Sequence, residues 1–256
     1  TSGKPLAETD ISGFSADCIW NNSLDQGLNN LSDARMDRIN RMVRLQRWLG
    51  LSYEETDLLL SACIRAQGAD NSKYALNADT LRMLGVFRHW QQKYRITAFQ
   101  FAAVLSQMTP YAISPAVPFL DQVFNSPSLF DEPFAITGAT ISYTDATGDN
   151  ARTVRQICAG LDITQAQFRV LADRVAVQLG DASAHTFPLT LATVSALYRL
   201  VMLPRWLGLS FADGVALCSL LGQNDSVWTT LAGVPQLSGE GDILDILMAL
   251  EAAAEW

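Results

Sequence analysis

Apolar residues recur at helical spacing in several stretches of the chain, and polar residues rich in glycine or proline separate these stretches. This pattern is typical of a mainly α protein. It predicts helices over residues 34–49, 53–67, 79–94, 98–108, 152–160, 165–179, 190–206, 211–222 and 242–255.

The six residues RWLGLS occur twice, at 47–52 and at 205–210. Each copy follows one apolar run of helical spacing and precedes another, so each copy is expected to join two helices. The similarity extends to residues before the copies, where Arg41, Val43 and Leu45 recur as Arg199, Val201 and Leu203.

Each copy also contains the residues that a helix–helix connection needs. Its glycine can adopt the left-handed conformation that ends a helix, and its serine can cap the next one. An acidic residue three positions after the serine completes a capping-box pattern, more loosely in the second copy. These residues are Gly50, Ser52 and Glu55 in the first copy and Gly208, Ser210 and Asp213 in the second.

Two degenerate copies follow the same order of residue types, at 94–100 and at 161–167, with Thr97 and Thr164 in the capping position. The four caps are separated by 45, 67 and 46 residues. Intervals of about 45 residues are typical of helical repeat proteins, in which helix pairs pack on their neighbours. The predicted architecture is therefore an irregular, solenoid-like helical repeat.

The longer interval contains a proline-rich insert, residues 109–150. Its second half alternates β-branched residues and predicts a small β-hairpin within residues 133–150. Asp145 to Asn150 offers oxygen ligands but lacks the spacing of an EF-hand, so a solvated turn is expected there. The predicted organisation is an irregular segment at 1–30, a first repeat pair at 31–108, the insert, and a second repeat set at 151–256.

Charge and the ends of the chain narrow the class of protein. A net charge of −8 and a pI near 4.7 argue against nucleic acid and anionic membranes as partners. The sequence lacks an initial methionine and a signal-like pattern, and residues 243–256 resemble a helix before another RWLGLS-type connection, with Trp256 in the place of Trp48. We therefore expect a piece of a longer protein, truncated at its C-terminus.

Candidate metal and thiol chemistry is sparse. Cys18, Cys63, Cys158 and Cys218 form no CxxC pair and are interpreted as buried, inert thiols rather than disulfide or metal-ligating residues. His89 and His185 stand far apart, so a two-histidine metal site would have to be built by the fold. We predict no metal and no cofactor.

Aromatic and basic residues beside the repeat allow two interpretations. Trp48 and Trp206 could stack on a ligand, but we expect both to be buried core residues at equivalent positions. Arg44, Arg47 and Arg205 could bind an anion, but solvated charges at helix ends are the simpler interpretation. No nucleophile elbow, phosphate loop or zinc signature is present, so no catalytic residue and no enzyme activity are predicted.

The order of several motifs resembles one family, the A subunit of the bacterial Tc (toxin complex) insecticidal toxins. The resemblance covers residues 31–256, and the aromatic-flanked FLDQVFNSP is its most specific piece. The motifs are RMDRINRMVRLQRWLGLSYEETDLLL, QQKYRITAFQFAAVL, FLDQVFNSPSLF, GDNARTVRQICAGLDITQAQFRVL and LATVSALYRLVMLPRWLGLSFADGVAL.

The resemblance implies a non-catalytic segment of the α-helical shell of a secreted, pore-forming translocation subunit. In that family the subunit is a homopentamer whose shell encloses a translocation channel, and it binds a host-cell receptor and a B–C component. The implied partners of this segment are other parts of the same subunit, with no nucleic acid and no direct membrane insertion. The alternative is a stand-alone helical-repeat scaffold that binds a protein partner.

Overall fold

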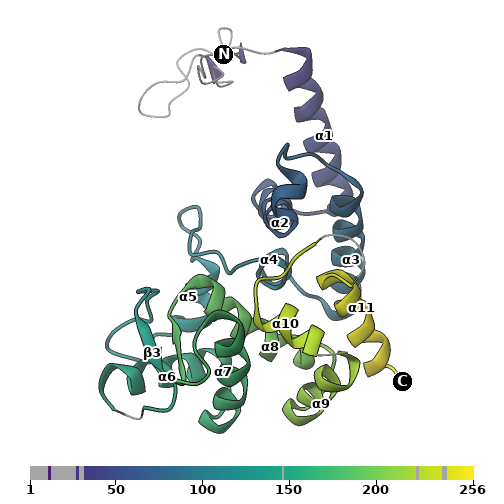
Figure 1. Cartoon of the computed structure of the whole chain (residues 1–256). Helices are drawn as coiled ribbons and strands as arrows, with labels where there is room; N and C mark the ends of the chain where they lie inside the picture. The colour runs from purple at the N-terminus through teal and green to yellow at the C-terminus, as the bar shows by residue number, and fades with distance from the viewer. Residues whose placement is uncertain (1–10, 13–26, 29–31, 146, 223–224, 238–240) are drawn as a thin grey trace. The chain divides into compact units, whose positions relative to one another are not determined.

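The computed structural model describes residues 11–12, 27–28, 32–145, 147–222, 225–237 and 241–256. The chain forms two compact units, residues 1–53 and residues 54–256. Helices dominate the described residues (Figure 1), which confirms the predicted mainly α class.

In the first unit, α1 (Asp33–Leu49) begins at Ser32, whose side chain accepts a hydrogen bond from the Arg35 N–H. It ends at Gly50, which adopts the left-handed conformation (φ 68°) and donates its N–H to the Gln46 carbonyl. The two-residue strands β1 (Ile11–Ser12) and β2 (Gly27–Leu28) pair antiparallel and were not predicted.

The second unit continues with helices and one two-stranded sheet (Figure 1). Its helices are α2 (Tyr53–Gln67, whose first residue belongs to the first unit), a 3-10 turn at Gly68–Asn71, α3 (Ala78–Tyr94), α4 (Ala98–Leu105), α5 (Phe119–Phe124), α6 (Gly148–Leu161), α7 (Gln165–Leu179), α8 (Leu191–Trp206), α9 (Phe211–Leu221), α10 (Ser226–Ala232) and α11 (Ile243–Ala254). The strands are β3 (Thr140–Ser142) and β4 (Thr186–Pro188).

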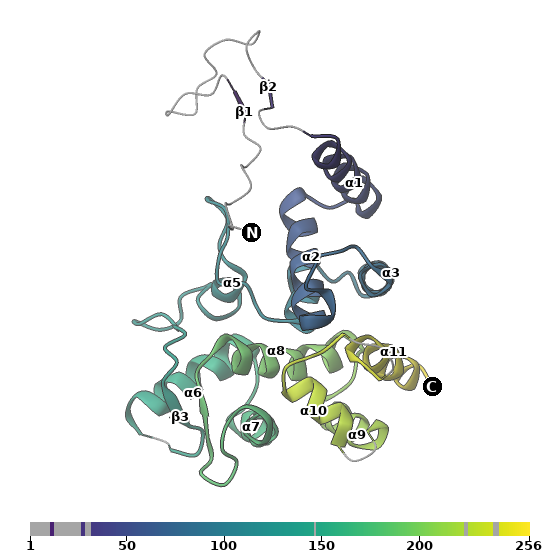
Figure 2. The ribbon, with the colours of Figure 1, turned by 45° about the horizontal axis from the view of Figure 1, so that its top comes forward.

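Helix α8 forms the centre of the second unit. It packs against α4, α7, α9 and α10, and Figure 2 shows α7 and α10 beside it. Every residue from Thr193 to Val201 is buried. The helix is apolar on nearly all sides because it is covered on nearly all sides.

In all four connections, the residue two positions before the serine or threonine adopts the left-handed backbone conformation. Gly50, Arg95, Asp162 and Gly208 have φ values of 68°, 57°, 51° and 73°. Thr97 and Thr164 form complete capping boxes with Gln100 and Gln167, and Ser210 accepts the Asp213 N–H. The repeated connection is therefore a backbone feature, and it persists where arginine or aspartate replaces the glycine.

Three local predictions need correction. Helix α4 ends at Leu105, and helices α5 and α10 were not predicted. The predicted hairpin is wrong, because β3 pairs antiparallel with β4, more than forty residues later, with Ile141 opposite Phe187. Both of these side chains are buried, so the non-local pair covers apolar surface that a hairpin within the insert would leave exposed.

The turn at Asp145 has the expected character. Its carboxylate accepts hydrogen bonds from Thr147 and Asn150, and these bonds lower the pKa of Asp145. Within the described residues no single helix has the length and apolar character of a bilayer span. Helices α8 and α9 reach that standard only together, across a bend of 104°.

Candidate functional site

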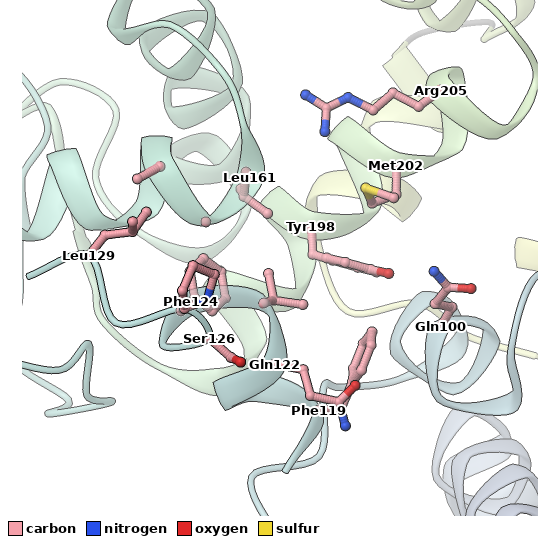
Figure 3. A pocket seen from close by; sticks show the side chains of 14 residues that line it. Gln100, Phe119, Gln122, Phe124, Ser126, Leu129, Leu161, Tyr198, Met202 and Arg205 are labelled. Atoms are coloured by element: carbon pink, nitrogen blue, oxygen red, sulfur yellow. The ribbon is translucent and has the colours of Figure 1, made fainter. Parts of the chain in front are cut away.

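A cavity of about 380 Å³ lies beside α5 (Figure 3). It is formed by the segment 119–129, the end of α6, one face of α8 and a side chain of α4. The residues that line the cavity include Phe119, Gln122, Phe124, Ser126, Leu129, Gly160, Leu161, Tyr198, Met202, Arg205 and Gln100. The most family-specific stretch of the sequence therefore builds one wall of this cavity.

Aromatic packing holds that wall in place. The Phe119 ring lies 5.6 Å from Tyr198 in an edge-to-face arrangement, and Phe124 lies 4.6 Å from Phe134. Helix α6 approaches so closely that a Cβ at Gly160 would lie 2.3 Å from the Phe124 ring. A glycine is required there because any side chain would push α5 away.

Asn125 fixes the turn that follows α5. Its side-chain oxygen accepts the Phe134 N–H at 2.7 Å, and its amide donates to the Phe134 carbonyl at 3.0 Å and to Asp121 at 2.7 Å. These paired bonds imitate a strand pairing with residue 134. The asparagine of FLDQVFNSP therefore has a structural role that its sequence position alone did not indicate.

The polar groups of the cavity are hydrogen-bonding groups rather than reactive ones. Burial raises the pKa of Tyr198, although its contact with Gln100 opposes this, so the phenol stays protonated. Arg205 donates to the Asp162 carbonyl, which ties the end of α8 to the connection after α6. Among the described lining residues no nucleophile has a neighbouring base. The size and the aromatic lining of the cavity suit an apolar or aromatic group.

The prediction that both repeat tryptophans are buried is wrong for Trp48, which is 53% exposed. Trp206 is half-buried and meets Trp90 and Tyr198 edge-to-face, at 6.4 Å from each. The tryptophan of the second copy is thus a packing residue in an aromatic cluster. The same six-residue sequence therefore leaves its tryptophan buried to different degrees in the two copies.

The three arginines considered for an anion site belong to two different helices. Arg44 and Arg47 are exposed on α1 of the first unit, and Arg205 ends α8 of the second. Arg205 serves as a donor to Asp162, as described above. Arg205 is therefore a charge in the last turn of its helix, as expected, and it is tied to the next connection by this bond.

The described cysteines are buried and free, as predicted. Burial raises the pKa of each thiol, to about 11 at Cys158 and at Cys218, and also raises that of Cys63. Such thiols are poor nucleophiles and poor metal ligands at neutral pH. Cys18 lies outside the described residues.

The histidines take part in two separate polar clusters. His89 Nε2 lies 2.8 Å from Glu251, and His185 Nδ1 lies 3.3 Å from the Tyr143 hydroxyl, which donates to Asp173 at 2.7 Å. Within the described part of the chain no three histidine, cysteine or acidic residues are grouped as metal ligands.

Glu251 is a buried charge that the sequence analysis missed. One carboxylate oxygen accepts from His89, Lys93 (2.6 Å) and Tyr94 (3.1 Å), while the other oxygen is buried without a partner. Burial alone would raise the pKa of Glu251, but the Lys93 and His89 contacts outweigh it and lower the pKa. Together with the Arg82–Asp242 ion pair at 2.7 Å, this cluster joins α3 to α11.

Arg199 is a second buried charge, and it has no carboxylate partner. The side chain is fully buried and donates to the Leu231 and Gly233 carbonyls of α10 and to Ala103, Val104 and Ser106 carbonyls at the end of α4. Burial lowers its pKa to about 9, so it remains charged at neutral pH. It caps two helix C-termini at once, where unpaired carbonyls and the helix dipoles favour a cation.

The fold and the cavity together define a helical scaffold class, built from helix pairs around one buried helix. No family model matches the chain. The toxin subunit YenA1 of Yersinia entomophaga is 39% identical to it over 233 residues, which is 90% of this chain and 20% of that protein.

Two solved structures share the fold. Yersinia pseudotuberculosis TcaA-TcaB superposes with a TM-score of 0.60 at 23% identity, over 81% of this chain and 10% of that one. Morganella morganii TcdA4 superposes with a TM-score of 0.66 at 15% identity, over 91% of this chain and 9% of that one. The chain belongs to the Tc toxin subunit family, and it spans about a fifth of the length of the curated relative it matches.

Proposed function

We propose that this chain is a non-catalytic segment of the shell of a Tc toxin A subunit, a secreted translocation component that encloses a channel. The observation that carries the proposal is the 39% identity to a toxin subunit across 90% of the chain. The architecture supports it, because a continuous helical scaffold with charges used for capping suits a wall better than a reaction centre.

The partners follow from the same proposal. Other segments of the same subunit contact this one, and the complete subunit forms a homopentamer that engages the B–C component and a host-cell receptor. Neither nucleic acid nor direct membrane insertion by this segment is part of the function. The proposed division of the chain is residues 31–108 and 151–256 as repeat sets, with 109–150 inserted between them.

The runner-up, a stand-alone scaffold, has weaker support. It would explain the helix pairs and the open cavity, but it gives no reason for identity to a protein five times longer. It predicts that residues 1–256 are functional by themselves, which a pull-down with the isolated chain would reveal.

Locating a tag in the complete subunit tests the shell proposal. An epitope inserted between Ser183 and Ala184, both exposed in the turn before β4, leaves the helices intact. Antibody labelling in electron micrographs of the assembled subunit should place the tag on the outer wall of a pentamer. Density on the channel axis, or hydrolytic activity that maps to this segment, would overturn the proposal.

A further inference from the structure

A second hollow, an open groove, lies apart from the cavity beside α5. It has a volume of about 810 Å³ and runs between the outer face of α2 and the extended segment that follows α4. Phe99, Leu191 and Val234 complete its lining.

The groove has a layered apolar surface. Its floor contains the buried Ala62 and Met108, and its sides contain the half-buried Leu58. Its rim exposes three large apolar side chains: Tyr111 (81% exposed), Ile113 (69%) and Val234 (62%). Exposed apolar side chains around a groove are a feature of surfaces that bind a partner, and here polar residues such as Ser61 and Gln107 lie among them.

The charged residues that line the groove are acidic toward the start of α2 and basic at its end. Glu54 lines it at the first turn of α2, Asp57 lines it one turn later, and Arg65 lines it at the last turn. Within the described part of the chain none of these three side chains forms an ion pair. Residues 57 and 65 are eight positions apart on one helix, which separates the two ends by about 12 Å.

We propose that this groove receives an amphipathic helix from another segment of the same toxin subunit. That helix carries two or three apolar anchors at i, i+3/i+4 and i+7 spacing, a lysine or arginine beside Glu54 and Asp57, and an acidic residue beside Arg65. The inference rests on the proposed function, since it requires the longer subunit of which the relative is an example.

The size and the chemistry of the groove favour a helix of the same polypeptide over a small ligand. A small-molecule site usually encloses its ligand and orients it with a few buried polar groups. Here the groove is open along its length, and its charged groups stand at the two ends. Opposite charges toward the two ends of α2, with apolar side chains between them, match the side of a helix about two to three turns long.

Photo-crosslinking in the complete subunit tests the proposal. A photoreactive phenylalanine replaces Tyr111 in one variant and Tyr74 in the other. Both tyrosines are exposed (81% and 76%), but only Tyr111 lines the groove. We expect the Tyr111 variant to cross-link to one helical peptide of the subunit outside residues 1–256, and the Tyr74 variant not to cross-link to that peptide.

A charge reversal then tests the direction of the helix. Asp57→Lys should lower the yield of the Tyr111 cross-link about 5-fold, the effect of roughly 1 kcal/mol of unfavourable charge contact. Asp131→Lys, at an exposed acidic residue away from the groove, should leave the yield unchanged.

The outcomes separate the groove from the proposed function. A Tyr111 cross-link to a separate protein, to residues 1–256 or to nothing overturns the helix-in-groove proposal, as does equal yield in Asp57→Lys. If the same samples still assemble and carry the epitope of the preceding section on the outer wall, the shell proposal stands and the groove proposal alone has failed.

Discussion

The two RWLGLS copies share a backbone and differ in what surrounds them. Gly50 and Gly208 both adopt the left-handed conformation. Yet Arg199, six positions before Arg205, is completely buried, while its counterpart Arg41 is exposed and pairs with Asp37 in the preceding turn of α1. A repeated sequence thus specifies the local chain path, and the neighbouring helices decide whether a side chain becomes core or surface.

Replacing Arg199 should give the largest effect. Arg199→Met leaves the carbonyls at the ends of α4 and α10 buried without donors, so we expect a loss of about 3–5 kcal/mol in the free energy of unfolding. Urea denaturation followed by circular dichroism measures it. Arg41→Met is the matched control and should cost under about 0.5 kcal/mol. Equal losses would show that burial does not distinguish the two copies.

Glu251 should rank second and adds a dependence on pH. Glu251→Gln weakens the contacts with His89, Lys93 and Tyr94 and should cost about 1–2 kcal/mol at pH 7. Because the folded pKa of Glu251 is lowered, its contribution is present above the unfolded pKa of about 4.3 and is lost as pH falls through the folded value.

The difference between wild type and Glu251→Gln should therefore be constant from pH 7 to about pH 5 and shrink toward pH 3. Other carboxylates titrate equally in both proteins and cancel in the difference. A difference that grows as pH falls would contradict the assigned direction of the pKa shift.

The tryptophans give a smaller contrast. Trp206→Ala removes a half-buried ring from the cluster with Trp90 and Tyr198 and should cost about 1–2 kcal/mol, less than the loss of a fully buried ring. Trp48→Ala, at a side chain that is mostly exposed, should cost under about 1 kcal/mol. Thermal unfolding of both variants checks this ranking. A larger loss of stability in Trp48→Ala than in Trp206→Ala would show that the exposed fraction of the side chain does not predict its contribution.

The smallest expected effects concern the left-handed residues. Gly208→Ala should destabilise by about 1 kcal/mol because a Cβ is unfavourable at positive φ. The reciprocal change, Asp162→Gly at the equivalent position, should stabilise by about 0.5–1 kcal/mol. Urea titrations of both variants measure the pair. If both substitutions changed the free energy of unfolding in the same direction, the two connections would not be equivalent.

Local features were predictable from the sequence because they depend on neighbouring residues. The caps Thr97, Thr164 and Ser210, and the boundaries of α2, α7 and α8 to within a residue, follow from spacing and capping chemistry. Helix α5 escaped prediction because six residues between prolines show no helical period. They form a helix because Phe119, Leu120 and Phe124 find buried partners.

The buried charges and the groove depend on residues far apart in sequence. In the sequence, Arg199 was notable only because it matches Arg41 in the repeat. The residues near it do not indicate that its five hydrogen-bond acceptors are carbonyls at the ends of α4 and α10. The cavity beside α5 was not predicted, since the sequence marked FLDQVFNSP only as a family-specific motif. Side-chain environments created by packing therefore have to be read from the fold.

Pairing of β3 with β4 has a consequence for how this architecture can change. Gly138 and Leu189 are hydrogen-bonded backbone neighbours, so the chain leaves and returns at one point after completing α6 and α7. An excursion with adjacent ends can be lengthened at its exposed turns without displacing the helices before and after it. We therefore expect length variation among related chains to concentrate in the exposed turns within residues 138–189 rather than in α6, α7 or α8, which pack against other helices.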